Sequence, residues 1–66
     1  MTLVERVESI VVQAGSAGLD YKEVTARLVL AGAQEGSVAM RLSELAEAGR
    51  LGIAGRRNGR SLYVAP

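Results

Sequence analysis

Residues 51–64 read LGIAGRRNGRSLYV, and their apolar side chains alternate with small or polar ones. This period of two is typical of β-strands that are buried on one face. Asn58-Gly59 lies near the middle of the segment, and Asn-Gly is the preferred dipeptide of a two-residue type I′ hairpin turn. The segment therefore predicts a β-hairpin over about residues 51–65, with its turn at Asn58-Gly59.

A two-residue turn also fixes which residues of the two strands lie opposite one another, because strand side chains alternate between the two faces. Ile53, Leu62 and Val64 should then share the face that covers the rest of the chain. Tyr63 should lie on the outer face. The expected opposed pairs are Arg57 with Arg60, Arg56 with Ser61, Gly55 with Leu62, and Ile53 with Val64.

The residues before this hairpin have helical spacing instead, and the first helix is predicted over about residues 2–14. Thr2 and Glu5 lie three residues apart and can form a capping box, and Gly15 can end the helix. The apolar stripe is wider than one packed face needs. The additional residues are either core or a dimer seam, and they are Val4, Val11 and Val12.

A second helix is predicted over about residues 20–31. Asp20 can cap its first turn, Glu23 can reach back to complete the capping box, and Gly32 can end the helix. This is the strongest local signal in the chain.

A third helix is predicted over about residues 35–48, with Val38, Leu42 and Leu45 on its inner face. Gly49 follows it and suits the left-handed backbone conformation that commonly ends a helix. The order of elements is therefore three helices followed by one hairpin, which is an α+β arrangement.

The composition allows one small domain and restricts its chemistry. The chain has 66 residues, of which 48% are hydrophobic, and it contains no Cys and no His. Disulfides and metal sites made of thiolate or imidazole are therefore excluded. We find no nucleophile with a base, no phosphate-binding Gly motif and no cofactor motif, so we expect a protein that is not an enzyme and binds no cofactor or metal.

Charge is distributed unevenly along the chain, although the net charge is only +1. Residues 1–40 carry −2, and residues 41–66 carry +3 because five Arg there face only two Glu. A basic end on a small domain is typical of proteins that bind nucleic acid or acidic surfaces. Charges interrupt the apolar run of the first eight residues, so we expect no signal peptide, no membrane span and a cytoplasmic location.

With these elements in place, the chain resembles the winged helix-turn-helix superfamily of DNA-binding domains, as found in bacterial and phage regulators. The resemblance covers residues 19–64. It rests on the capped second helix, on the basic hairpin, and on the pattern Val-x-x-x-Leu-x-x-Leu-x-x-x-Gly-x-Leu from Val38 to Leu51. Residues 32–36 form a longer link between the second and third helices than is usual in that superfamily.

The resemblance implies a three-helix winged helix-turn-helix with a C-terminal β-hairpin wing, and double-stranded DNA as the partner. In such domains the N-terminal half of the third helix enters the major groove. Arg41 is then the best candidate for a bidentate contact to guanine. The third-helix positions left to face DNA are Gln34, Ser37, Ala39, Met40, Arg41 and Ser43.

The hairpin supplies the other candidate site, because three arginines surround its turn where packing does not require them. Guanidinium groups suit a phosphate backbone or a narrow minor groove. Charges on an exposed strand can instead serve only to block edge-to-edge aggregation. The candidate DNA-binding residues of the hairpin are Arg56, Arg57, Asn58 and Arg60.

Taken together, these observations predict a double-stranded DNA-binding protein that regulates transcription and is associated with the nucleoid when bound. The chain can also form a homodimer through its first helix. The alternative is a winged-helix module that binds another protein without specific DNA binding. Its apolar docking surface would consist of Val4, Val11, Val12, Val29 and Leu30.

Overall fold

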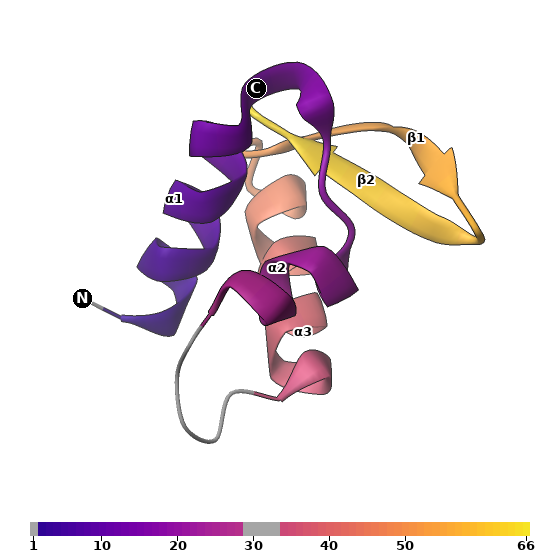
Figure 1. The fold of residues 1–66 in the computed structure, drawn as a ribbon. Coiled ribbons are helices and arrows are strands. Elements are labelled where there is room, and N and C mark those ends of the chain that lie inside the picture. Colours follow the sequence, from indigo (N-terminus) through magenta and orange to yellow (C-terminus); the bar gives the residue numbers. More distant parts are fainter. Residues whose placement is uncertain (1, 29–33) are drawn as a thin grey trace.

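Three α-helices precede a two-stranded antiparallel sheet in the computed structural model, which describes residues 2–28 and 34–66 (Figure 1). This α+β arrangement confirms the predicted fold class and has the layout of a winged helix-turn-helix. A 3₁₀ turn, Gly15–Ala17, follows the first helix. The elements are α1 (Leu3–Ala14), α2 (Tyr21–Arg27), α3 (Glu35–Glu47), β1 (Gly52–Arg57) and β2 (Arg60–Val64).

Both predicted capping boxes are present. At α1, the Thr2 hydroxyl accepts the Glu5 N–H at 3.3 Å, and the Glu5 carboxylate accepts the Thr2 N–H at 2.9 Å. At α2, Asp20 Oδ1 accepts the Glu23 N–H at 2.8 Å, and Glu23 Oε1 accepts the Asp20 N–H at 3.1 Å. Each box satisfies backbone donors that the first helical turn leaves without a partner, so local sequence alone sets where these helices begin.

The end of α3 is also as predicted. Gly49 has a φ of 77°, and its N–H donates to the Ala46 carbonyl at 3.1 Å. The N–H of Arg50 donates to the Leu45 carbonyl at 2.9 Å. These two hydrogen bonds form a Schellman motif, in which a left-handed glycine satisfies the last carbonyls of the helix.

The predicted end of α2 needs correction. The helix ends at Arg27, because Leu28 has a φ of −87° and a ψ of 89°, outside the helical region. Leu28 still donates its N–H to the Val24 and Thr25 carbonyls, and its side chain is buried in the core. Leu28 is thus both the first residue beyond the helix and a member of the core. The predicted remainder of the helix, 29–31, and the predicted stop at Gly32 lie outside the described residues.

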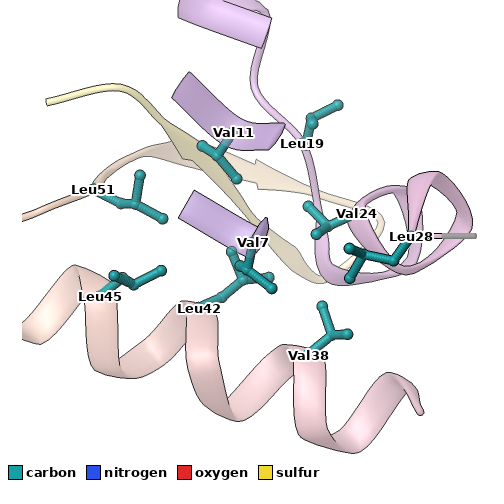
Figure 2. Packing of buried hydrophobic residues seen from close by; sticks show 9 residues of the cluster. All are labelled: Val7, Val11, Leu19, Val24, Leu28, Val38, Leu42, Leu45 and Leu51. Atoms are coloured by element: carbon teal, nitrogen blue, oxygen red, sulfur yellow. The ribbon is translucent and has the colours of Figure 1, made fainter. Parts of the chain in front are cut away.

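The core is aliphatic and lies between the three helices and the start of the hairpin (Figure 2). Side chains of α3 point toward those of α1 and α2 in Figure 2, so α3 forms one wall of the core. Burial of each Val or Leu side chain contributes about 1.5 to 3 kcal/mol. The buried cluster consists of Val7, Val11, Leu19, Val24, Leu28, Val38, Leu42, Leu45 and Leu51.

The wide apolar stripe of α1 is explained mainly by this core. Val11 is fully buried, and Val4 is partly buried and packs against the core. Val12 is the member of the valine set that lies on the surface, with 46% of its area exposed. Val11 therefore cannot belong to a dimer seam or a docking surface, and the stripe is wide because α1 packs against two neighbouring helices.

A backbone bridge ties the hairpin to the segment before α2. The Leu19 N–H donates to the Tyr63 carbonyl at 3.0 Å, and the Tyr63 N–H donates to the Leu19 carbonyl at 2.8 Å. The outer edge of β2 is thus paired over one residue. Because Asp20 follows Leu19 directly, this bridge sets the N-terminus of α2 beside β2 (Figure 1).

The hairpin has the predicted turn. Asn58 and Gly59 both have positive φ, 54° and 78°, as a type I′ turn requires. Of the four predicted pairs, the three next to the turn are confirmed, namely Arg57 with Arg60, Arg56 with Ser61, and Gly55 with Leu62.

The fourth predicted pair is wrong, because a β-bulge at Ala54 interrupts the register. Ile53 pairs with Tyr63 instead of Val64, and Gly52 pairs with Val64. One extra residue in a strand moves every side chain beyond it to the other face. Gly55, with a φ of 146°, supplies a backbone conformation at the bulge that other residues rarely adopt.

The burial of the hairpin side chains also differs from the predicted faces. Ile53, predicted on the covered face, is 55% exposed, whereas Leu51 is buried. Tyr63, predicted on the outer face, packs against the core. Leu62 and Val64 lie beside Gly18, whose absent side chain leaves them room: a Cβ there would meet the Leu62 Cβ at 3.3 Å.

Two glycine substitutions test this account of the hairpin. Gly55→Ala should destabilise the chain by about 1 to 3 kcal/mol, because alanine is strained at a φ of 146°. Gly36→Ala is the matched control: Gly36 lies in α3, a Cβ there meets nothing within 4 Å, and we expect a gain of about 0.5 to 1 kcal/mol. Urea unfolding measures both changes. Equal effects of the two substitutions would contradict the bulge.

Candidate nucleic-acid interface

Two of the three hairpin arginines are bound to the first turn of α2. Arg60 Nε donates to Asp20 Oδ2 at 3.1 Å. Arg57 forms an ion pair with Glu23 through Nη2 and Oε1. The two arginines are opposed across the turn. The hairpin therefore presents both guanidinium groups to the same helix end, which the Leu19–Tyr63 bridge holds beside β2.

Each carboxylate in this group has a second role in the capping box. Asp20 accepts the Glu23 N–H through Oδ1 and Arg60 through Oδ2. Glu23 Oε1 accepts both the Asp20 N–H and Arg57. The capping box of α2 is thus extended by two guanidinium groups, and we call these four residues the cap–arginine cluster: Asp20, Glu23, Arg57 and Arg60.

The environment of Asp20 stabilises its charged form. Burial by itself raises the pKa of this carboxyl, but the Glu23 N–H and the Arg60 guanidinium, with a smaller contribution from the Lys22 N–H, outweigh it. The net result is a pKa below the ordinary value for aspartate. Loss of one of these donors would leave the charge of a buried carboxylate less well compensated.

Arg56 and Asn58 differ from the cap–arginine cluster. Both are exposed, and Asn58 lies in the turn itself. Arg56 Nη2 donates to the Gly59 carbonyl at 2.6 Å, which holds the side chain along the hairpin. Within residues 2–28 and 34–66, Arg56 has no carboxylate partner. Its charge is therefore the most available of the three arginine charges to an anion in solution.

The candidate residues of α3 lie along one helix and differ in exposure. Gln34 is the N-cap residue, and its side chain makes no capping hydrogen bond. Four of the six are exposed: Gln34, Ser37, Met40 and Ser43. The other two, Ala39 and Arg41, are half-buried.

Arg41 is occupied within its own helix. Its Nε lies 2.8 Å from Glu44 Oε1 as an ion pair, but this N–H makes no hydrogen bond. Its Nη2 lies 2.9 Å from the Met40 sulfur. A bidentate contact from Arg41 to a base would therefore require the side chain to leave Glu44.

The surface charge differs between the two candidate regions. Segments 19–28 and 52–64, which hold α2 and the hairpin, carry five cations and two carboxylates, or +3. The residues of α3 carry one cation and three carboxylates, or −2. Electrostatic attraction to phosphate is therefore concentrated on α2 and the hairpin. The cations of this region are Lys22, Arg27, Arg56, Arg57 and Arg60.

The structure brings the hairpin candidates together with α2 and not with α3. Among the described residues, no side-chain hydrogen bond or ion pair joins the hairpin to α3. The sequence identified Asp20 and Glu23 only as caps. Their arginine partners lie 40 and 34 residues away, and no local pattern connects groups so far apart.

An acid titration tests the buried part of the cluster. Asp20 has a lowered pKa when folded, so it contributes stability above its unfolded pKa of about 3.9, and this is lost as pH falls through the folded value. Asp20→Asn keeps a capping side chain but removes the charge. We expect it to lower the free energy of unfolding by about 1 to 2 kcal/mol at neutral pH. The free energy of unfolding of the variant should then decrease less than that of the wild type as the pH falls.

Urea unfolding between pH 7 and pH 3 measures that loss. Glu47→Gln is the matched control, because it removes one negative charge from an exposed position of α3. Parallel pH profiles of Asp20→Asn and the wild type would refute the assigned role of the Asp20 carboxylate.

Comparison with known proteins gives no relative: no family model, no curated protein and no solved structure matches the chain. Within the described residues, no helix is long and apolar enough to cross a membrane. The same residues contain no group of three His, Cys, Asp or Glu side chains that could hold a metal ion. The resemblance to winged helix-turn-helix domains thus rests on the sequence pattern and on the order of elements.

Proposed function

We propose that this chain binds double-stranded DNA as a regulator of transcription, with the hairpin on the phosphate backbone or in the minor groove and the N-terminal half of α3 in the major groove. The proposal rests on one observation: the hairpin and α2 carry a net charge of +3 on a small domain. On this proposal the chain works in the cytoplasm and is associated with the nucleoid when bound.

Hairpin geometry supports a grip on phosphate. A charged edge that only blocks aggregation needs one or two charges. Here Arg56 is exposed at the turn without a carboxylate partner in the described part of the chain, and a bulge already distorts the edge strand β1. The bulge already disrupts pairing along this edge, so the charge of Arg56 is available for a phosphate contact.

The reading of base sequence falls to α3 in this proposal. Its N-terminal half exposes neutral polar and apolar side chains that can approach base edges: Gln34, Ser37 and Met40. Of the three carboxylates of α3, Glu44 and Glu47 lie in the C-terminal half, which in helix-turn-helix docking is farther from the bases, whereas Glu35 lies in the first turn. Phosphate contacts then position the protein, and base contacts specify the site.

The protein-binding alternative has less support. Of its proposed docking residues, Val11 is in the core and Val4 is partly buried, while Val29 and Leu30 lie outside the described residues. Val12 alone is a large exposed residue of that set within 2–28 and 34–66. A homodimer through α1 would have to be built on the same residue, and the DNA-binding proposal does not require it.

Salt dependence tests the hairpin. Arg56→Ala should reduce the slope of log affinity against log salt by about 0.9 if this residue neutralises one phosphate. Arg6→Ala is the matched control, because Arg6 is an exposed arginine of α1. The measurement is fluorescence anisotropy with a labelled duplex over a series of salt concentrations. Loss of the same slope in both variants would indicate a general charge effect and remove Arg56 from the interface.

Base preference tests α3. We expect duplexes selected from a random pool to show a consensus, and Arg41→Ala to relax the preference at one base position by about 1 to 3 kcal/mol. Glu47→Gln serves as the control substitution on the same helix, because Glu47 is exposed and is not a candidate contact. Uniform weakening on all duplexes would make Arg41 a phosphate contact, and a pool without enrichment would refute sequence-specific regulation.

A further inference from the structure

The geometry of the cap–arginine cluster points to Glu23 as a residue that attenuates DNA binding. We propose that a backbone phosphate of the duplex competes with the Glu23 carboxylate for Arg57, so that Arg57 exchanges one anion for the other when DNA binds. Arg60 remains bound to Asp20 and keeps the hairpin in place. This inference rests on the proposed function and assigns different roles to arginines that look equivalent in the sequence.

Exposure separates the two ion pairs. In the Arg57–Glu23 pair, 49% and 36% of the side-chain areas are exposed. In the Arg60–Asp20 pair, the corresponding values are 31% and 4%. Water screens an exposed pair strongly, so its dissociation is easy, whereas separating Arg60 from Asp20 would leave a buried charge without its partner. Phosphate can therefore displace Glu23 but not Asp20.

Glu23 also keeps stabilising partners after Arg57 leaves. Its Oε1 still accepts the Asp20 N–H in the capping box. Its charge lies in the first turn of α2, where the helix dipole favours an anion. Arg27 Nη1 lies 3.4 Å from the Glu23 carbonyl, and Lys22 precedes Glu23 in the chain, so two cations remain nearby. The exchange thus needs no unfolding of the helix.

The exchange predicts that the wild type binds DNA more weakly than it would if Arg57 had no partner in the free protein. Each phosphate contact by Arg57 must first break its ion pair with Glu23. Removing the charge of Glu23 without removing its hydrogen bond should release Arg57 in advance. Glu23→Gln does this, since Gln can also serve as the third residue of a capping box. Its amide oxygen can accept the Asp20 N–H as the carboxylate does.

The experiment is a double-mutant cycle of duplex binding at several salt concentrations, with circular dichroism to verify the fold of each variant. Glu23→Gln should strengthen binding about two- to fivefold and steepen the salt slope by up to about 0.9. In a protein that already carries Arg57→Ala, Glu23→Gln should no longer strengthen binding. Glu47→Gln makes the same change of charge on α3, and its effect should be unchanged by Arg57→Ala.

Two results would overturn the inference while the proposed function stands: Glu23→Gln has no larger effect than Glu47→Gln, or its gain persists without Arg57. Absence of duplex binding by the wild type and by all the variants would instead overturn the proposed function, and this inference with it. Binding by Glu23→Gln but not by the wild type would support both.

Discussion

A buried carboxylate at the junction of α2 and the hairpin constrains this small domain. Among the described residues, Asp20 is the polar side chain that is buried. An ionised carboxylate in such a place is tolerated only when hydrogen bonds and an opposite charge compensate for the lost water. Asp20 obtains these from the backbone of α2 and from Arg60 of the hairpin. The start of a helix and the position of a distant hairpin therefore depend on one side chain.

The same junction explains why the hairpin arginines are not equivalent. Arg60 is bound to the most buried partner, Arg57 to a half-buried one, and Arg56 to a backbone carbonyl. A run of arginines around a turn suggests a uniform basic tip. In the structure they differ: Arg60 anchors the hairpin, Arg57 forms a more exposed ion pair, and Arg56 is free of carboxylate partners among the described residues. The difference between the first two arises because Asp20 is more deeply buried than Glu23. A nucleic acid would meet a hairpin that is already oriented by its own ion pairs.

The basic charge and the proposed base-reading surface lie on different elements of this molecule. The basic groups lie on α2 and the hairpin, whereas α3 carries a net charge of −2 and its one arginine is paired with Glu44. In the proposed complex, attraction would come from the hairpin side, and α3 would contribute shape and a few polar contacts. The aliphatic core that holds α3 in place uses valines and leucines from all three helices, so α3 is positioned by packing.

Sequence alone determined the features that depend on neighbours within a few residues. Both capping boxes, the glycine that ends α3, and the type I′ turn at Asn58-Gly59 were predictable, because each involves backbone groups and side chains at most five residues apart. Three of the four hairpin pairs followed from the turn for the same reason. The arginines of the hairpin were recognisable as candidates, although their partners were not.

Tertiary structure decided the rest, because it depended on contacts between distant segments. The end of α2 at Arg27, the bulge at Ala54 and the exposure of Ile53 are not revealed by the local apolar pattern. Arg57 and Arg60 find carboxylates 34 and 40 residues away because the Leu19–Tyr63 bridge brings α2 to the hairpin. A local pattern specifies which side chains need partners, but the packing of the helices and strands selects the partners.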